Sequence, residues 1–266
     1  MDTSSRKILF FDVDGTLITN DDKKILPQST IQAINLAKQK GHLTFVNSGR
    51  VFCNIYDDIK SVGFDGYVCG CGTYIFAKGK EIFHNKLSRE VCMDMVETCS
   101  LYKMKALYEH TNHVAYDGKV GLGDAYYLIE YFQSMGTPII DDVFDSKFIF
   151  DKFVAAYDDK SQLEEFKRYA SAKFDCIQRE RDFLEVVPKG YSKATGIEFL
   201  LNYYDIPISN AYAFGDSNND LDMLKYVPNS IAMRDSSEEV LEVSGYVTDS
   251  VIDDGIFKAM KHLGII

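Results

Sequence analysis

The sequence predicts an α/β protein in which a doubly wound, parallel, Rossmann-like sheet is interrupted by an inserted α+β domain. Three observations predict this fold class. Apolar runs of strand length alternate with helical patterns over residues 8–69, the alternation breaks over residues 87–187, and it resumes after Pro188. Strands separated by helices pair in parallel through right-handed crossovers. We therefore expect a core built from residues 1–86 and 188–266, with residues 87–187 as a separate inserted domain.

The first half of the predicted core begins with Ile-Leu-Phe-Phe at residues 8–11, an apolar run too short for a helix. Pro27 followed by Ser29 and Thr30 indicates the start of a helix, and Gly41 indicates its end. The other elements expected here are strands at 42–46 and 67–69, a helix that ends near Gly63, and a hairpin at 74–76 and 81–83.

The inserted domain mixes helices and strands without the crossover order. Its expected helices cover a segment that begins at Ser88, residues 123–135 and residues 161–170; its expected strands cover 105–116 (two strands), 148–157, 174–178 and 183–187. The second half of the core is expected to contain helices at 192–204, 219–226, 236–243 and 255–262, and strands at 211–214, 230–233 and 246–248.

Two carboxylates, Asp12 and Asp14, follow the first strand directly, and Gly15 comes next. Open α/β sheets bind ligands at this end of their strands, and a turn at Gly15 lets both acids border one crevice. Three interpretations are open. Asp12 is a nucleophile with Asp14 as its general acid and base, the pair is a structural cation site, or the strand simply ends in a polar turn.

Other strands of the predicted core end in similar polar tips. Ser48 and Gly49 follow the second strand, Asp216 and Asp220 follow the strand at 211–214, and Lys193 opens the helix after the insertion. Four converging aspartates would carry several uncompensated negative charges, and a divalent cation removes that conflict. Oxygen ligands without a nearby histidine favour a hard ion, so we expect Mg²⁺.

The composition limits the partners. The chain has 266 residues with 29 Lys and Arg against 40 Asp and Glu, a formal net charge of −11, which argues against nucleic acid or an anionic membrane as a partner. The spacing of the six cysteines fits neither a zinc site nor a disulfide framework, so buried free thiols in a reducing compartment are expected. No signal peptide or membrane span is evident in the sequence, and we expect a cytoplasmic protein, monomeric or a weak homodimer.

Taken in order, these motifs resemble a known family. F-F-D-V-D-G-T, V-N-S-G-R, a lysine soon after the insertion, and G-D-S-N-N-D-L-D-M-L look like the haloacid dehalogenase (HAD)-like hydrolase superfamily, and within it the Cof-like subgroup of capped sugar phosphatases. The resemblance implies that the insertion is an α/β cap that selects the substrate. The chain departs from the subgroup at residues 71–73 and 232–236, which weakens any transfer of a particular substrate.

The resemblance also implies a role for each matching residue. Asp12 would attack phosphorus and form an aspartyl phosphate, and Asp14 would act as the general acid and then the base. Asp12, Asp14 (through its backbone carbonyl) and Asp216 would hold Mg²⁺, with Asp220 supporting the metal or Lys193. The residues expected to bind the phosphate or the rest of the substrate are Ser48, Gly49, Arg50, Lys193 and Asn219, although Arg50 could instead pair with an acid of the core.

The sequence therefore predicts a Mg²⁺-dependent phosphatase that hydrolyses small phosphate monoesters, with sugar phosphates as the expected substrates. Two alternatives stay open: a phosphomutase-type phosphotransferase on the same core, and a signalling or binding protein that stores an aspartyl phosphate without turnover. The polar residues of the insertion that could bind a sugar are His110, Asn112, His113, Arg179, Glu180 and Arg181. His110 and His113 alone do not predict a metal site, because the sequence identifies no further ligands.

Overall fold

The computed structural model describes residues 6–179 and 182–266, and the chain divides into two compact units. Unit 1 contains residues 1–49, 56–82 and 192–266, and unit 2 contains residues 50–55 and 83–191. Each unit has its own sheet and its own buried core. The second unit is thus an insertion into the first, and it also takes in a short segment that directly follows Gly49.

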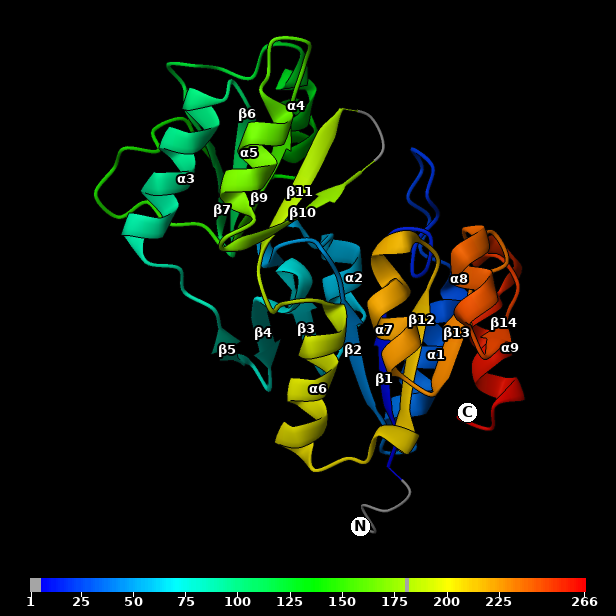
Figure 1. Ribbon diagram of the computed structural model, residues 1–266. Coiled ribbons are helices and arrows are strands. Elements are labelled where there is room, and N and C mark those ends of the chain that lie inside the picture. The colour runs from blue at the N-terminus through cyan, green and yellow to red at the C-terminus, as the bar shows by residue number, and fades with distance from the viewer. Residues whose placement is uncertain (1–5, 180–181) are drawn as a thin grey trace. The chain divides into compact units, whose positions relative to one another are not determined.

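In the described part of the chain, eight strands form one sheet in the order β14-β13-β12-β1-β2-β3-β4-β5 (Figure 1). The strands are β1 (Ile8–Phe11), β2 (Leu43–Asn47), β3 (Gly66–Cys69), β4 (Tyr74–Ala77), β5 (Lys80–His84), β12 (Ala211–Gly215), β13 (Asn229–Ala232) and β14 (Tyr246–Val247). β1 lies between β12 and β2 and is parallel to both. Strands from the two ends of the chain therefore meet side by side at the centre of the sheet.

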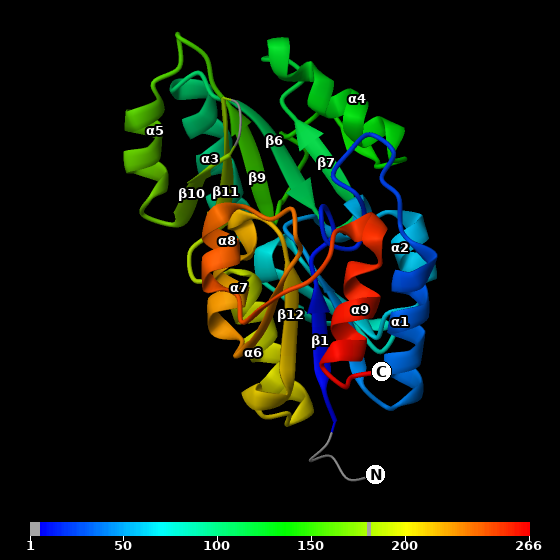
Figure 2. The same ribbon diagram turned by 90° about the vertical axis from the view of Figure 1, so that its right-hand side faces the viewer.

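Helices cover both faces of this sheet. Figure 2 shows α6 (Lys193–Tyr204), α7 (Leu221–Tyr226) and α8 (Glu238–Val243) on one side of β1 and β12, and α1 (Gln28–Gln39) and α9 (Gly255–His262) on the other. The short helix α2 (Asp57–Ser61) follows β2. All four residues of β1 are fully buried, and Phe11 stacks on Phe214 of β12 with ring centroids 4.7 Å apart. This packing fixes the ends of β1 and β12 relative to each other.

Unit 2 is built on a second sheet, six-stranded among the described residues, in the order β10-β11-β9-β6-β7-β8. Its strands are β6 (Lys105–His110), β7 (His113–Tyr116), β8 (Ile139–Ile140), β9 (Lys152–Ala156), β10 (Phe174–Gln178) and β11 (Phe183–Pro188). Helices α3 (Arg89–Leu101) and α5 (Leu163–Ala170) cover one face, and α4 (Tyr127–Ser134) packs on the other (Figures 1 and 2). Phe150, Phe153 and Phe174 pack together on the face that α3 and α5 cover.

The α/β class and the parallel Rossmann-like core are as the sequence predicts. In unit 1, the helix expected at 219–226 is a 3₁₀ turn over Asn218–Asp220 followed by α7. Larger differences lie in unit 2. The strand expected at 148–157 begins only at Lys152, because Phe148 and Phe150 pack in the core ahead of the ladder. The helix expected at 123–135 is a 3₁₀ turn over Gly123–Tyr126 followed by α4, and the two-residue strand β8 is not predicted. All six cysteines are free thiols, as expected, but Cys53 and Cys176 are only partly buried, whereas buried thiols were expected.

Candidate active site

The candidate site lies in unit 1, where the chain leaves β1 and β12. Asp12 follows β1 and is 3% exposed, and its backbone N–H donates to the carbonyl of Phe214 at 3.0 Å. Asp216 follows β12, the strand that pairs with β1. Oxygen atoms of Asp12, Asp216 and Asp220 all lie within 4.8 Å of one another. The parallel register thus brings carboxylates about two hundred residues apart in the sequence into one cluster.

Gly15 makes room for this cluster. It has a φ of +82°, which favours glycine, and a Cβ built on it would lie 2.2 Å from Oδ2 of Asp216. Thr16, the next residue, is fully buried and donates its hydroxyl to Oδ1 of Asp216 at 3.0 Å. The glycine and threonine that follow the first acidic tip therefore position the second one.

Lys193 supplies the positive charge of the cluster. Its side chain is 1% exposed, and Nζ lies 2.5 Å from Oδ1 of Asp12 and 2.6 Å from Oδ1 of Asp220. Lys193 is the first residue of α6, whose N-cap Ser192 forms a capping box with Thr195. The cap fixes the start of the helix, so the buried ammonium group projects from a rigid position.

Asp220 holds the cluster together through both of its oxygens. Oδ1 accepts from Lys193, and Oδ2 accepts from the backbone N–H groups of Asp216 and Ser217 at 3.0 and 3.1 Å. A carboxylate engaged in this way is fixed in orientation. Asn219 is nearby, with its Oδ1 3.4 Å from Lys193 Nζ and 2.8 Å from the hydroxyl of Ser217.

The charges of this cluster do not balance. Three carboxylates face one ammonium group. Burial raises the pKa of Asp12 to about 7. The neighbouring carboxylate of Asp220 also raises this pKa, whereas the ammonium group of Lys193 lowers it and so offsets only part of the increase. Burial and the neighbouring Asp12 and Asp220 raise the pKa of Asp216 to about 8. The cluster therefore favours an additional cation, and its all-oxygen donor set suits a hard divalent ion such as Mg²⁺.

Asp14 lies beside the cluster but is more accessible. Its side chain is 30% exposed, and Oδ1 lies 3.3 Å from Nζ of Lys24, which comes from the loop after β1. A half-exposed carboxyl group can exchange protons with a bound molecule or with water. Among the described residues, the side chain of Asp14 is not one of the three carboxylates whose oxygen atoms lie within 4.8 Å of one another.

The polar residues that follow β2, Ser48 and Gly49, are also in unit 1. Ser48 is 2% exposed, its N–H donates to the carbonyl of Val68 at 2.9 Å, and its own carbonyl accepts from Cys71 N–H. Asn47, at the end of β2, donates to the carbonyl of Lys193 at 3.1 Å and so connects this tip to the start of α6. Ser48 and Gly49 thus belong to the same end of the sheet as Asp12.

Arg50 belongs to unit 2, where it donates to the hydroxyl of Tyr131 at 2.7 Å and to the carbonyl of Asn54 at 3.3 Å. Arg179 also lies in unit 2 and binds Glu185. His110 and His113 stack on each other, and Asn112 accepts from both. Glu180 and Arg181 lie outside the described residues.

Sequence reasoning missed three residues of this region: Thr16, Lys24 and Asn47. Thr16 carries a usable signal, because it lies within two residues of both Asp14 and Gly15 in the same turn. Asn47 also carries a signal, because it stands in the V-N-S-G-R motif next to Ser48, and it is fully buried. Lys24 carries none, because a lysine in a polar loop is an ordinary surface choice.

Comparisons with known proteins identify the family of this chain. The family model described as haloacid dehalogenase-like hydrolase matches residues 9–260. The chain belongs to the haloacid dehalogenase-like hydrolase family.

Similar proteins include YkrA of Bacillus subtilis (strain 168), which is named as a phosphatase and is 30% identical over 98% of each chain. The B. subtilis 5-amino-6-(5-phospho-D-ribitylamino)uracil phosphatase YcsE is 24% identical over 96% of this chain and 95% of that protein. Among solved structures, the HAD subclass IIB sugar phosphatase BT4131 superposes with a TM-score of 0.81 at 26% identity and covers 98% of this chain and 100% of that one. Together these relatives support a phosphatase function.

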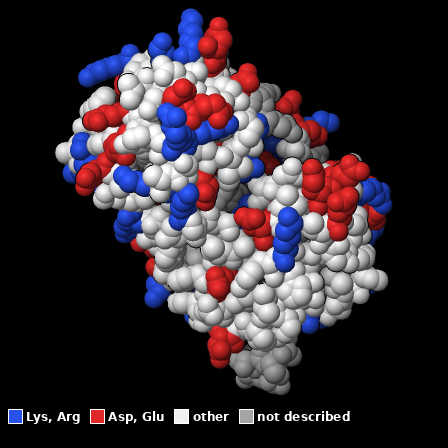
Figure 3. Space-filling model, in the orientation of Figure 1, with Lys and Arg blue, Asp and Glu red and all other residues white. Residues whose placement is uncertain are grey.

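The distribution of surface charge and the length and apolar character of the helices are relevant to possible partners. On the face drawn in Figure 3, Lys and Arg side chains are scattered among Asp and Glu. Within residues 6–179 and 182–266, none of the helices combines the length and the apolar character that crossing a bilayer requires.

Proposed function

We propose that this protein is a Mg²⁺-dependent phosphatase that hydrolyses small phosphate monoesters, chiefly sugar phosphates, through an aspartyl phosphate on Asp12. The observation that carries the proposal is the buried cluster of Asp12, Asp216 and Asp220 around Lys193, with three carboxylates against one ammonium group. A phosphate monoester brings about −1.5 to −2 further charges near neutral pH. Such a substrate requires a cation in addition to Lys193.

In the first step, a carboxylate oxygen of Asp12 attacks phosphorus, the new O–P bond forms, and the bond to the ester oxygen breaks. Asp14 donates a proton to the departing oxygen, which leaves as an alcohol. In the second step, Asp14 accepts a proton from water, the water oxygen attacks phosphorus, and the bond to Asp12 breaks. The partial exposure of Asp14 supports this role, because its proton must exchange with both the alcohol and water.

Asp12, Asp216 and the backbone carbonyl of Asp14 would hold Mg²⁺, with Asp220 oriented behind them by the N–H groups of Asp216 and Ser217. When bound, the ion neutralises negative charge on the phosphoryl group. Lys193 stabilises the same charge from the protein side. Its two carboxylate partners keep it protonated, because they hold the pKa of the ammonium group well above its usual range despite burial. Ser48, Gly49 and Asn219 are proposed to bind the remaining phosphate oxygens, and Arg50 to bind the substrate.

The substrate class is proposed from two relatives: a sugar phosphatase of similar structure, and a phosphatase named for a phosphorylated ribityl compound. The substrates in these two names carry their phosphate on a polyhydroxylated carbon chain. We propose that unit 2, the cap, selects the leaving group, and that the core supplies the chemistry.

The test is a panel of sugar and nucleotide monophosphates assayed for phosphate release with Mg²⁺ and with a chelator. We expect release only with Mg²⁺ and fastest on sugar phosphates. Asp12→Asn should lose about 10³-fold or more of the activity, the size expected for removing a nucleophile. Asp222→Asn is the matched control, because Asp222 is an exposed aspartate on α7 of the same unit.

A labelled phosphoryl group should be recovered on the wild-type chain after acid quenching, and it should be absent from Asp12→Asn. An active Asp12→Asn variant would contradict the covalent route. Movement of label between hydroxyls of one sugar without free phosphate would indicate a phosphotransferase. A labelled chain that persists without release would indicate a signalling protein.

A further inference from the structure

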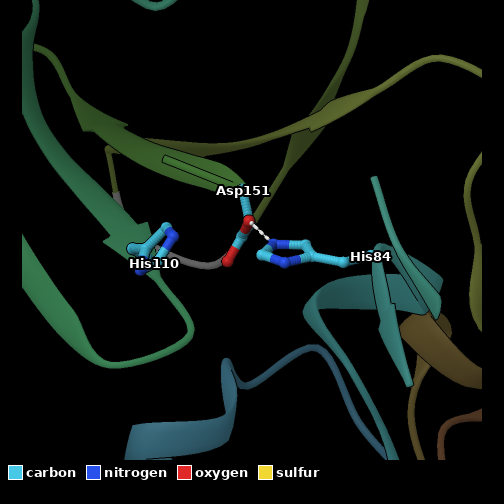
Figure 4. Close-up of side chains that lie close together, drawn as sticks. All are labelled: His84, His110 and Asp151. Atoms are coloured by element: carbon cyan, nitrogen blue, oxygen red, sulfur yellow. Dashed lines mark hydrogen bonds and ion pairs between the residues drawn. The ribbon is translucent and has the colours of Figure 1, made fainter. Parts of the chain in front are cut away.

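Unit 2 contains a second group of metal-ligating side chains that the phosphatase proposal does not use. His84 is the last residue of β5, His110 is the last residue of β6, and Asp151 directly precedes β9. One donor atom from each lies within 4.8 Å of the other two. Figure 4 shows the carboxylate of Asp151 between the two imidazole rings. Residues far apart in sequence thus bring two nitrogen donors and one oxygen donor together.

Asp151 has surroundings that are unusual for a buried carboxylate. It is 1% exposed, and its Oδ1 lies 2.6 Å from Nε2 of His84. Its other oxygen, Oδ2, is buried and has no hydrogen-bond partner among the residues that the structure describes. A buried carboxylate oxygen left without a donor costs free energy, so buried polar atoms normally find one. The missing interaction is one that a cation would supply.

His110 is held in the tautomer that a metal ligand needs. Its Nδ1 lies 2.8 Å from Oδ1 of Asn112, and an amide oxygen only accepts hydrogen bonds. Nδ1 therefore carries the proton, and Nε2 keeps its lone pair. Ligating histidines in proteins usually have such an outer partner on the second ring nitrogen. Asn112 also binds Nδ1 of His113, whose ring stacks on that of His110 and so restrains its orientation.

The backbone fixes two of the three ligands relative to each other. The N–H of Asp151 donates to the carbonyl of Glu109 at 2.8 Å, and β6 pairs with β9 next to this bond. Asp151 and His110 therefore sit at the same end of two paired strands. His84 and Asp151 are shielded from solvent, with side chains 4% and 2% exposed, while His110 is partly exposed. An ion bound here would have a protected inner side and an accessible outer side.

We propose that His84, His110 and Asp151 form a Zn²⁺ site in unit 2, separate from the acidic cluster of unit 1. Two imidazoles and one carboxylate are a donor set that zinc uses in proteins with three protein ligands and an open fourth position for water. Mg²⁺, in contrast, prefers oxygen ligands alone. In a tetrahedral zinc site the donor atoms lie roughly 3.3 Å apart. The 2.6 Å contact between His84 and Asp151 would have to open by less than 1 Å to admit the ion.

The proposal is tested on the full chain after dialysis against a chelator and then against excess Mg²⁺. Zn²⁺ is titrated by calorimetry, and Co²⁺ is titrated separately and followed by visible absorption. Tetrahedral Co²⁺ with nitrogen donors absorbs far more strongly than octahedral Co²⁺ among oxygens, so the spectrum distinguishes this site from the acidic cluster. We expect one Zn²⁺ per chain and the intense tetrahedral Co²⁺ spectrum.

Three variants and a control locate the ion. His110→Ala and Asp151→Asn should each weaken Zn²⁺ binding by about 100-fold or more and abolish the Co²⁺ spectrum, while Asn112→Ala should weaken binding by about 10–100-fold. His262→Ala, an exposed histidine of α9, should leave both unchanged. A thermal unfolding curve in Mg²⁺ confirms that each variant is folded. Equal Zn²⁺ binding by His110→Ala, Asn112→Ala and wild type would overturn the proposal, and so would a wild-type chain that gives only the weak octahedral spectrum.

Discussion

Each unit of this protein buries a cluster of charged side chains, and the two clusters differ in their balance. In unit 1, Asp12, Asp216 and Asp220 surround one ammonium group, that of Lys193. In unit 2, the cluster is made of two carboxylates and two cations: Glu109, Glu185, Lys152 and Arg179. The first three lie in neighbouring strands, and Arg179 directly follows β10. The first cluster has surplus negative charge, and the second is neutral in its formal sum.

The pKa shifts follow this difference. In unit 1, burial and the surplus of carboxylates raise the pKa of Asp12 to about 7 and that of Asp216 to about 8. In unit 2, burial would raise the pKa of Glu185, but Lys152 and Arg179 outweigh it and lower the pKa to about 2. Burial still raises the pKa of Glu109, because Lys152 offsets only part of it. A buried cluster that is balanced supports the fold, whereas one that is unbalanced is ready to bind a cation.

The variant with the largest expected effect is Lys193→Met, which changes the unbalanced cluster. The variant removes the ammonium group that touches both Asp12 and Asp220. Under the proposed mechanism, the charge of a bound phosphoryl group then loses its partner on the protein. We expect phosphate release to fall by about 10³-fold, the size of effect seen when a donor to transition-state charge is removed. The measurement is kcat on the best substrate of the panel at saturating Mg²⁺.

Lys225→Met is the matched control, because Lys225 is an exposed lysine on α7 of the same unit. It should keep activity within about twofold of wild type, as expected for a surface substitution. Mg²⁺ should raise the melting temperature of Lys193→Met more than that of wild type, because the variant has an even larger surplus of negative charge. Turnover by Lys193→Met within tenfold of wild type would show that the lysine is merely structural.

The second test is Lys152→Met in the balanced cluster. The substitution leaves Glu109 buried without the ammonium group 3.3 Å from its Oε1, while Glu185 keeps Arg179. Removing one partner of a buried ion pair costs about 3–5 kcal/mol. We expect a loss of that size in the free energy of unfolding, measured with urea at pH 7, and we expect it to be the same with and without Mg²⁺.

Lys160→Met, an exposed lysine of unit 2, should change the free energy of unfolding by less than about 0.5 kcal/mol. If Lys152→Met changed the free energy of unfolding by as little as Lys160→Met, the neutral cluster would contribute nothing to the stability of the fold. If Mg²⁺ restored its stability, the two clusters would not differ in the way proposed.

These two clusters also show how far the sequence alone can lead. The cluster of unit 1 was largely predictable, because each of its acids follows a short apolar strand, and the ends of parallel strands meet at one edge of a sheet. The contacts of Lys193 were not predictable in detail. Its position after the insertion indicated a role, but only the fold shows that one ammonium group binds Asp12 and Asp220 together.

The cluster of unit 2 was not predictable. Glu109, Lys152 and Glu185 lie in or at the start of strands, each next to at least one apolar or aromatic residue, and a charged residue that alternates with such residues normally marks a solvent-facing side. In the structure all three are buried, at 4%, 4% and 6% exposure, because neighbouring strands place opposite charges next to one another. Strand pairing decides this, and it depends on contacts distant in sequence. The same holds for His84 and Asp151, which sequence spacing could not connect with His110.

The smallest expected effect is a pH dependence that only the unbalanced cluster should show. Without a bound cation, the folded protein keeps protons on Asp12 and Asp216 up to about pH 7 and 8, while the unfolded chain has released them near pH 4. The folded state therefore binds more protons in this range, so these two groups make the metal-free protein less stable as the pH rises from about 4 to 8. Glu185 contributes the opposite sign, but its lowered pKa confines that contribution to the range between about pH 2 and 4.5.

Mg²⁺ should reverse this trend, because it binds the deprotonated carboxylates. Protons compete with it below the raised pKa values, so its affinity should rise with pH by on the order of tenfold per unit, about 1.4 kcal/mol, between pH 6 and 8. Melting temperatures measured with and without Mg²⁺ across this range should diverge as the pH increases. The divergence should be smaller in Asp216→Asn, which has one titrating ligand fewer, and unchanged in Lys152→Met. A Mg²⁺ effect independent of pH would mean that the acids of unit 1 are already ionised at pH 6, and the raised pKa values inferred for Asp12 and Asp216 would be wrong.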